Sequence, residues 1–256
     1  MSSQRKIAVV TGAGSGIGLA VAERLARDGH HVVLADIRPA QEQARQIQQQ
    51  ADEAGRGGVA RAATVDIADA AAVEAFFKAF GDEHGRLDIL VNNAGIDRRG
   101  TLERVSVEQI DAVLSVNLRG TILVSRAALP LLRVVRGTIV NVASELGIIG
   151  APGLPVYVAT KGGVVQLTKA LAIDHAADGI RVNCVCPGAT LTPLLQESID
   201  TAPDPEARRR LLDGTTLMRR VGRPEEIANV ICFLASDEAS FMTGAIVPVD
   251  GGATAA

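Results

Sequence analysis

The sequence predicts a doubly wound α/β domain, in which one parallel sheet of seven strands carries helices on both faces. Two observations predict it. Short β-branched runs alternate with longer Ala-, Leu- and Glu-rich segments of helical spacing along the whole chain, which is typical of βαβ units. In addition, 47% of the 256 residues are hydrophobic but only 2% are aromatic, as expected for a parallel sheet with an aliphatic core.

The seven strands are spaced evenly along the chain. They are expected at residues 7–11, 31–36, 59–66, 87–92, 137–144, 180–187 and 245–250. The segments between them, such as 19–27, 70–80 and 159–175, have helical spacing. No linker divides the chain, so residues 1–256 are predicted to form a single domain. An irregular insertion at about 190–222 interrupts the rhythm and is well placed to cover a ligand at the carboxyl ends of the strands.

Composition and charge argue against several classes of function. The net charge of −3, with acids and bases interspersed, and the few aromatic residues argue against a nucleic-acid partner. No window reaches 18 apolar residues and the N-terminus has no leader-like run, so we expect a cytoplasmic protein with no membrane partner. The histidines lack metal-ligand spacing and the cysteines lie in apolar contexts, which predicts reduced, buried thiols and no metal.

A glycine-rich turn, TGAGSGIG, follows the first strand directly. The strict G-x-G-x-x-G pattern is absent, because Ile17 and Leu19 stand where its last glycine would be. Glycines at such a turn let the backbone approach a pyrophosphate, which then binds at the helix N-terminus. The turn therefore predicts a dinucleotide site. Its spaced glycines are Gly12, Gly16 and Gly18.

Two acids follow the next strands. Asp36 ends the second strand at the distance expected for a carboxylate that bonds the adenosine ribose, and it would repel a 2′-phosphate. It therefore favours NAD over NADP; Arg38 is an opposing signal that we interpret as solvated. A helix cap or turn is the alternative for Asp36. Asp66 either holds the adenine together with the Ile67 amide or caps the next helix.

The segment YVATK places the only tyrosine of the chain, Tyr157, one helical turn before Lys161. A phenol is a poor base at neutral pH, but a nearby ammonium is expected to lower the pKa of Tyr157 into a useful range. Lys161 could also bond a nicotinamide ribose. Ser144, at the end of the fifth strand, would hold the substrate oxygen while hydride transfer interconverts an alcohol and a ketone. Packing is the alternative for Tyr157, and the neighbouring motifs favour catalysis.

In combination these motifs resemble the short-chain dehydrogenase/reductase family, in its single-domain branch with a Rossmann-type fold. The resemblance spans essentially the whole chain. It rests on TGAGSGIG (11–18), NNAG (92–95), SVNLRG (115–120), Ser144, YVATK (157–161), PGATLTP (187–193) and the ending GRPEEIANVICFLASDEASFMTGAIVPVDGG. It implies an enzyme that oxidises a secondary alcohol of polyol, sugar or hydroxy acid type with NAD, or reduces the ketone.

The resemblance also implies roles for individual residues. The catalytic residues would be Asn117, Ser144, Tyr157 and Lys161, with Asn117 holding a water that links Lys161 to solvent. The alternative for Asn117 is a structural side chain that bonds backbone within its helix. Asn92 is implied to stabilise the central strands rather than to act in catalysis.

The resemblance implies an extended cofactor site. Pro187-Gly188 with Thr192 would contact the nicotinamide amide. Ser15 and Ile37 stand where NADP-preferring members carry basic residues, which again favours NAD. The residues implied to bind the cofactor are Gly12, Ser15, Gly16, Ile17, Gly18, Asp36, Asp66, Ile67, Asn93, Ala94, Gly95, Tyr157, Lys161, Pro187, Gly188, Thr190 and Thr192.

The wall around a small-molecule substrate is expected from the loop after NNAG and from residues 145–155 and 190–215. An acid in the pocket would suit a polyol or sugar hydroxyl, whereas the alternative is a solvated loop acid. An arginine there either binds a substrate carboxylate or lies on plain surface. The polar candidates are Glu145, Asp97, Arg98 and Arg99.

Two alternative functions remain open. A 3-oxoacyl-carrier-protein reductase would dock its acidic carrier on basic residues where this chain has Val135, next to Arg136, and Asp178. The acid at 178 would repel such a carrier. A dinucleotide-binding sensor without catalysis is the other alternative, and the presence of Ser144, Tyr157 and Lys161 argues against it.

The expected assembly is a homotetramer, with a dimer as the alternative. The helices that hold Val107–Ala128 and Val156–Ala177 are apolar on more than one face, which is more than one sheet contact requires. Relatives in the family that the chain resembles pair these helices and the last strand.

Overall fold

The computed structural model describes residues 5–255. All seven strands pair in parallel in one sheet of order β3-β2-β1-β4-β5-β6-β7, which confirms the predicted doubly wound α/β fold. The strand order reverses between β1 and β4, and ligands of open α/β sheets bind at such a switch point. The strands are β1 (Ile7–Thr11), β2 (His31–Asp36), β3 (Val59–Thr64), β4 (Ile89–Asn92), β5 (Thr138–Val142), β6 (Arg181–Pro187) and β7 (Ile246–Val249).

Three strand ends differ from the predicted ones by two residues, and four others differ by one. β3 ends at Thr64 and β5 ends at Val142, so Asp66 and Ser144 lie two residues beyond their strands. β4 begins at Ile89, although the backbone of Asp88 already bonds Ile7 and Thr138. The polar side chains that follow β3 and β5 are therefore carried by loops at the carboxyl edge of the sheet.

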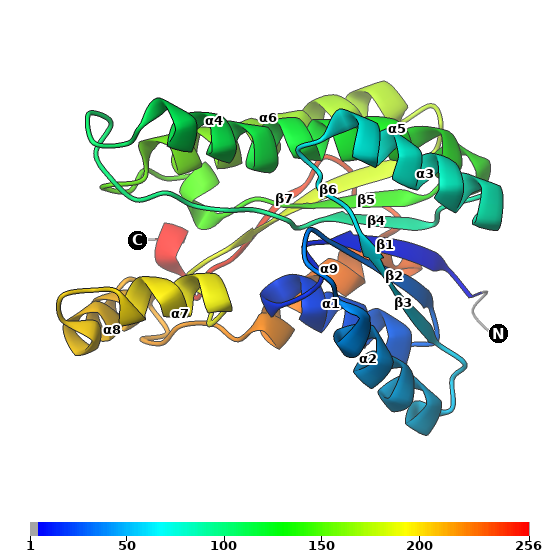
Figure 1. Ribbon diagram of the computed structural model, residues 1–256, viewed down its shortest axis with the longest axis horizontal. Coiled ribbons are helices and arrows are strands. Elements are labelled where there is room, and N and C mark those ends of the chain that lie inside the picture. The colour runs from blue at the N-terminus through cyan, green and yellow to red at the C-terminus, as the bar shows by residue number, and fades with distance from the viewer. Residues whose placement is uncertain (1–4, 256) are drawn as a thin grey trace.

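Helices cover both faces of the sheet (Figure 1). Strand side chains alternate between the two layers: Ala8 and Val10 pack in one aliphatic cluster, and Val9 packs in the other. One layer holds α1 (Gly16–Arg27), α2 (Gln41–Ala54) and α9 (Pro224–Ala235). The other holds α3 (Ala70–His84), α4 (Val107–Leu114), α5 (Thr121–Val135) and α6 (Pro155–His175).

A π-helical segment, Ser115–Gly120, joins α4 to α5. π-Helical turns occur mostly as local features and often at functional sites. Here the segment contains Asn117, whose side chain is almost completely buried against the loop that follows β4. The distortion therefore lies next to the catalytic end of the pocket described below.

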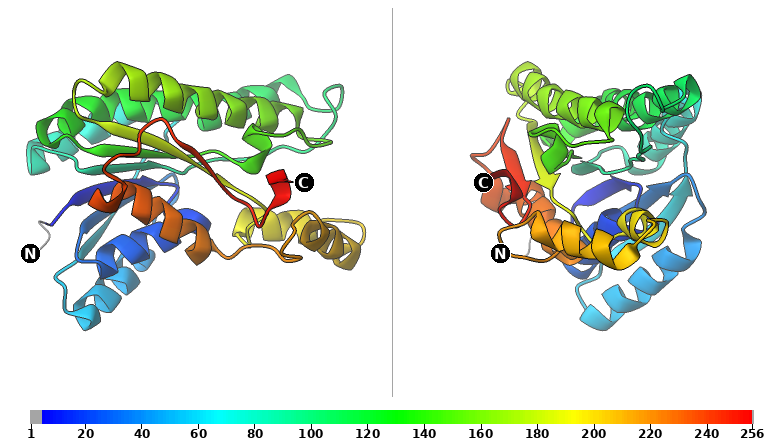
Figure 2. Two further views of the ribbon diagram at one scale, coloured as in Figure 1. Left: turned by 180° about the vertical axis from the view of Figure 1, so that it is seen from behind. Right: turned by 90° about the vertical axis from the view of Figure 1, so that its left-hand side faces the viewer.

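The segment between β6 and β7 contains two helices that project beyond the sheet, α7 (Pro193–Asp200) and α8 (Pro205–Gly214) (Figures 1 and 2). Thr190 and Gly222 form an isolated parallel bridge at its base. Ile199, Leu212 and Val221 form a small apolar cluster of their own. This segment is thus packed internally and held at both ends.

Within residues 5–255, no helix is long and apolar enough to cross a membrane, and no group of three or more His, Cys, Asp or Glu residues could hold a metal ion. Cys184, Cys186 and Cys232 are free and buried, as the sequence predicts. The Sγ atoms of Cys184 and Cys186 are 3.9 Å apart on the same face of β6.

Candidate active site

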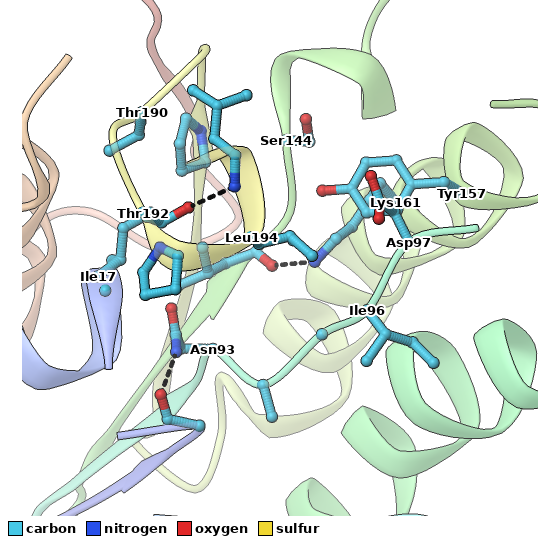
Figure 3. A pocket seen from close by; sticks show the side chains of 18 of the residues that line it. Ile17, Asn93, Ile96, Asp97, Ser144, Tyr157, Lys161, Thr190, Thr192 and Leu194 are labelled. Carbon is cyan, nitrogen blue, oxygen red and sulfur yellow. Dashed lines mark hydrogen bonds between the residues drawn. The ribbon is translucent and has the colours of Figure 1, made fainter. Parts of the chain in front are cut away.

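A cavity of about 720 Å³ lies between the carboxyl edge of the sheet and the helices α7 and α8. The glycine-rich turn lines one end of it and Tyr157 lines the other (Figure 3). Two of the predicted site residues, Gly18 and Asn117, do not line it. All the other predicted site residues do: Gly12, Ser15, Gly16, Ile17, Asp36, Asp66, Ile67, Asn93, Ala94, Gly95, Ser144, Tyr157, Lys161, Pro187, Gly188, Thr190 and Thr192.

The N-terminus of α1 is prepared for an anion. Its N-cap residue, Ser15, makes no side-chain capping bond, and the first turn contains no acidic residue. The free N–H groups and the positive end of the helix dipole therefore face the cavity uncompensated. Gly12 has a φ of +62°, and a Cβ there would lie 2.7 Å from Ala94 Cα. The backbone cradle thus fits the pyrophosphate of a dinucleotide.

Asn93 fixes this turn from the neighbouring strand. Its Nδ2 donates to the carbonyl oxygens of Thr11 and Gly12 at 3.0 and 3.1 Å (Figure 3). Gly18 is packed beneath the turn, where any Cβ would collide with the Gly12 carbonyl. Gly18 therefore permits close packing of α1 on β1 and has no contact with the cavity.

Asp36 is buried at the end of β2 and faces the cavity. Its Oδ2 accepts from Gly14 N at 2.9 Å and its Oδ1 accepts from Arg38 N at 3.0 Å. Each oxygen keeps a second acceptor position for a ribose hydroxyl. Arg38 is 75% exposed at its side chain, with Nε 4.0 Å from Asp36 Oδ1. Asp36 is not a helix cap, because Ala40 is the N-cap residue of α2. The bond from Arg38 N does close a local turn at Asp36, so the turn half of the alternative is confirmed.

Asp66 and Ile67 lie on the loop after β3. Asp66 Oδ1 accepts from Ala68 N at 2.9 Å, which closes a local turn. The alternative that Asp66 caps the next helix is wrong, since Asp69 caps α3 by accepting from the amides at positions 71 and 72. Asp66 and the buried Ile67 both line the cavity.

The far wall of the cofactor end comes from the loop after β6. Thr190 Oγ1 donates to the Gly188 carbonyl at 2.9 Å. Thr192 caps α7 by accepting from Leu195 N at 3.3 Å (Figure 3), and its methyl group faces Gly16 across the cavity. The start of the α7–α8 segment is therefore packed against the glycine-rich turn.

Ser144, Tyr157 and Lys161 meet at the other end (Figure 3). Ser144 follows β5 and accepts from Leu146 N at 3.1 Å, while Tyr157 lies in the first turn of α6. Lys161 is buried and donates from Nζ to the Val142 carbonyl at 2.9 Å; this Nζ lies 5.7 Å from the centre of the Tyr157 ring.

The predicted lowering of the Tyr157 pKa by Lys161 is wrong for this structure. Burial raises the pKa of Tyr157 to about 12, and the Ser144 hydroxyl opposes this only in part. Burial also lowers the pKa of Lys161 to about 8. The ammonium is directed at a carbonyl rather than at the phenol oxygen, and its own charge is destabilised, so it does not stabilise the phenolate.

Asn117 lies behind this group. Its Oδ1 accepts from Ile96 N at 2.8 Å, and its Nδ2 donates to the Ile96 carbonyl at 2.8 Å and to Thr160 Oγ1 at 3.2 Å. These bonds make Asn117 a structural side chain that bonds backbone, as the alternative holds, but that backbone belongs to the loop after β4 and not to its own helix. Gly95 lies between Asn117 and Lys161, and a Cβ there would be 3.4 Å from Asn117 Oδ1 and from Lys161 Nζ.

Asn92 belongs to the core of the sheet. Its Nδ2 donates to Ser125 Oγ and to Asn141 Oδ1, both at 2.9 Å, and Asn141 donates in turn to Thr168 at 2.9 Å. Asn92 does not line the cavity. This buried chain of polar side chains ties β4 and β5 to α5 and α6, which carry the catalytic end.

A family model described as enoyl-(acyl carrier protein) reductase matches residues 12–254. The chain belongs to the short-chain dehydrogenase/reductase family. It is 40% identical to the meso-2,3-butanediol dehydrogenase of Serratia marcescens over 255 residues, which cover 100% of this chain and 97% of that protein. It is 38% identical to a 3-oxoacyl-(acyl-carrier-protein) reductase of Thermotoga maritima, with coverages of 98% and 99%.

Solved structures of the family agree. The crystal structure of levodione reductase superposes with a TM-score of 0.89 at 36% identity, covering 98% of each chain. Members of the short-chain dehydrogenase/reductase family are oxidoreductases that use a nicotinamide dinucleotide, and the cavity of this member has the backbone cradle that such a cofactor requires.

The substrate end of this short-chain dehydrogenase/reductase contains two acids. Asp97 lines the cavity and is partly buried. Glu145 also lines it, and its Oε2 is buried without a hydrogen-bond partner among residues 5–255. Burial, followed by the charge of Asp250, raises the pKa of Glu145 to about 7. The alternative of a solvated loop acid for Glu145 is therefore wrong.

The two basic candidates, Arg98 and Arg99, differ in whether they line the cavity. Both arginines are exposed, but Arg99 lines the cavity, whereas Arg98 does not line it and donates to the carbonyl of the preceding residue at 2.7 Å. A third arginine, Arg208 of α8, also lines the cavity and was not singled out in the sequence. Its membership in the 190–215 segment was the available signal. Only the path of α8 shows which of its three consecutive arginines faces inward.

Proposed function

We propose that this chain is an NAD-dependent dehydrogenase that interconverts a secondary alcohol, of polyol, sugar or hydroxy acid type, and its ketone. The supporting observation is that Ser144, Tyr157 and Lys161 converge at one end of the cavity whose other end is formed by the glycine-rich turn and Asp36. That arrangement lets a proton donor or acceptor and a nicotinamide bound in the dinucleotide cradle act on the same substrate.

In this proposal each side chain has one task. Ser144 holds the oxygen of the alcohol or ketone through its hydroxyl. Tyr157 takes the hydroxyl proton during oxidation and returns it during reduction, and the bound nicotinamide accepts or supplies the hydride. Lys161 positions the nicotinamide ribose by bonding its hydroxyls. Asn117 holds the loop at Ile96, and a water held beside it would carry the proton between Lys161 and solvent.

The pKa of Tyr157 predicts how the rates of oxidation and reduction depend on pH. Because burial raises the pKa of Tyr157 to about 12, the phenol is protonated at neutral pH and ready to protonate a ketone oxygen. Oxidation requires the phenolate, so the kcat/KM for alcohol oxidation is expected to rise with pH up to at least pH 9, while that for ketone reduction does not rise.

The preference for NAD is supported by Asp36. Its buried carboxylate faces the cavity next to the glycine-rich turn, so a 2′-phosphate in that place would meet a negative charge. Arg38 is the nearest cation to Asp36, and its exposed side chain contributes less in water than a buried group would.

The proposal is tested by assaying secondary alcohols, polyols and 3-hydroxy acids with NAD and with NADP by nicotinamide absorbance, in the wild type and in Tyr157→Phe. Turnover with NAD that falls by about 10²- to 10⁴-fold in the variant is expected, with NADH binding retained. Equal turnover by both proteins would refute the role of Tyr157, and a preference for NADP would refute the role of Asp36.

A second candidate, reduction of a 3-oxoacyl group on a carrier protein, is favoured by the similarity to the Thermotoga reductase. Asp178 opposes it, although Arg133 and His175 partly compensate its charge at 2.8 and 2.9 Å. The same assay distinguishes the two, because carrier reduction would appear as NADPH or NADH oxidation only with an acyl-carrier substrate.

We also propose a cytoplasmic homotetramer. The support is apolar side chains that remain exposed in the single chain, including Val107 of α4, Ile122 of α5 and Ile173 of α6. Sedimentation equilibrium measures the assembly directly; a monomer would refute this proposal, and a dimer would leave only one such interface.

A further inference from the structure

Arg208 differs from the two arginines beside it on α8. Arg209 Nε lies 3.4 Å from Asp213 Oδ2, and Arg210 Nη1 lies 3.4 Å from Glu206 Oε2. Arg208 has no carboxylate within 4.0 Å among residues 5–255, and it lines the cavity that contains Tyr157. Its guanidinium is partly withdrawn from water without an ion-pair partner.

Arg99 faces the same cavity from the loop after β4. Burial, and then the charge of Arg99, lower the pKa of Arg208. Two guanidinium groups from distant parts of the sequence therefore line one cavity, and the positive charge of Arg99 disfavours that of Arg208. Such a pair is stabilised when an anion lies between its members.

The surrounding acids leave part of this charge uncompensated. Glu145 also lines the cavity, but burial raises its pKa to about 7, so below pH 7 most of its carboxyl is protonated and does not balance a cation. Asp97 Oδ2 lies 3.6 Å from Arg99 Nη2 and balances one of the two cations. Glu197 of α7 also acts on Asp97, but it is exposed and does not line the cavity. An unpaired charge in a partly buried wall costs free energy until a ligand pairs it.

This charge lies at the catalytic end of the cavity. Asp97 projects toward the same space as Tyr157 and Lys161 (Figure 3), and the charges of Asp97 and Arg99 both act on the pKa of Tyr157. The wall of the same cavity also includes the apolar side chains of Leu146, Leu194 and Leu211. A ligand that fits this end has a short aliphatic part between its reacting oxygen and a negative group.

We propose that Arg208, together with Arg99, binds the carboxylate of the substrate, so that the preferred substrate is a hydroxy acid rather than a neutral polyol or sugar. This inference rests on the proposed function and narrows its substrate class. A guanidinium can bond a carboxylate through two parallel N–H groups, which gives both affinity and orientation. Arg208 and Arg99 are then specificity-determining residues rather than part of the proton-transfer machinery.

The test compares acids with their own neutral esters. The kcat/KM values for 3-hydroxybutyrate and 4-hydroxypentanoate, and for the methyl ester of each, are measured with NAD in the wild type, Arg208→Gln and Arg210→Gln. Arg210 is the matched control, because it lies on the same helix and does not line the cavity. The wild type is expected to prefer an acid to its ester.

In Arg208→Gln, the kcat/KM for the acid is expected to fall by about 10- to 100-fold, the loss typical of a charge-assisted bond. The value for the ester should change by less than about 2-fold, and Arg210→Gln should change neither. Arg208→Lys should restore part of the loss, because it keeps the charge but not the planar fork. Added salt should raise the KM for the acid alone.

Different failures have different meanings. Ester oxidation as fast as acid oxidation in the wild type, or an equal effect of Arg208→Gln on both, would overturn the carboxylate site and leave the proposed dehydrogenase intact. An equal loss in Arg208→Gln and Arg210→Gln would overturn it as well. If no alcohol, polyol, acid or ester gave turnover that depends on Tyr157, the proposed function and this inference would fail together.

Discussion

Replacing Glu145 by glutamine removes a titratable group from the cavity wall while keeping its size. Burial raises the pKa of this carboxyl from 4.5 to about 7. At full burial that difference corresponds to about 3 kcal/mol, and partial contact with water in the cavity reduces it to roughly 1.5 kcal/mol. This free energy links the protonation of one side chain to the stability of the whole domain.

The sign follows from the direction of the change. Since the folded protein holds the Glu145 proton more tightly than the unfolded chain, the carboxyl stabilises the fold below pH 4.5, and this stabilisation is lost as the pH rises through about 7. Glutamine does not titrate. The free energy of unfolding of Glu145→Gln minus that of wild type should therefore be about 1 kcal/mol larger at pH 8 than at pH 5. The variant is thus more stable relative to wild type at the higher pH.

Urea unfolding of both proteins at pH 5 and pH 8, at one protein concentration, measures this double difference. All other titrating groups, including His30 and His31, are common to the two proteins and cancel. A difference between wild type and variant that is the same at both pH values would refute the reasoning, because it would mean that Glu145 ionises in the folded state as it does in water.

Four further substitutions test other parts of the structure. Gly12→Ala should destabilise the fold by more than about 2 kcal/mol and abolish NADH binding, because its φ is +62° and its Cβ would lie 2.7 Å from a backbone atom. Gly55→Ala, with a φ of +66° and nothing within 4 Å, should cost only about 1 kcal/mol in thermal or urea unfolding and spare NADH binding. Asp36→Asn should lower kcat/KM for NAD by about 10- to 100-fold and raise the ratio of NADP to NAD activity; an unchanged ratio would count against the ribose contact. Asn141→Leu should lower the free energy of unfolding by about 2 kcal/mol through the loss of two buried side-chain bonds, each 2.9 Å long, and no loss would show that the polar chain is dispensable.

Most of the fold was predictable because its determinants are local. Each predicted strand is an apolar run, and each is present in the sheet, with errors of about two residues at some ends. The errors have a common cause: the polar residues Asp66 and Ser144 follow apolar strands without a break in the sequence pattern, and only the pairing partners show where a ladder stops.

The composition of the site was also largely predictable, because short motifs carry it. Short motifs identify the two ends of the cavity: the glycine-rich turn with Asp36 at one end, and YVATK at the other. In the structure, residues of all of them line the same cavity. What could not be predicted is the pKa of the titratable side chains within the cavity. Burial raises the Tyr157 pKa and the Ser144 hydroxyl opposes this in part, and both effects depend on how α6 packs on β5 and on the loop that follows β5.

The sequence by itself determined the strand and helix order, the dinucleotide cradle and the identity of the tyrosine, since periodicity and glycine spacing are properties of neighbouring residues. Tertiary structure alone decided which side chains are enclosed. It buried an oxygen of Glu145 without a partner, directed Arg98 to solvent and Arg99 to the cavity, and selected Arg208 from three consecutive arginines. Burial and the proximity of charges arise from segments that are far apart in the chain. For that reason only the tertiary structure determines which side chains form the substrate end.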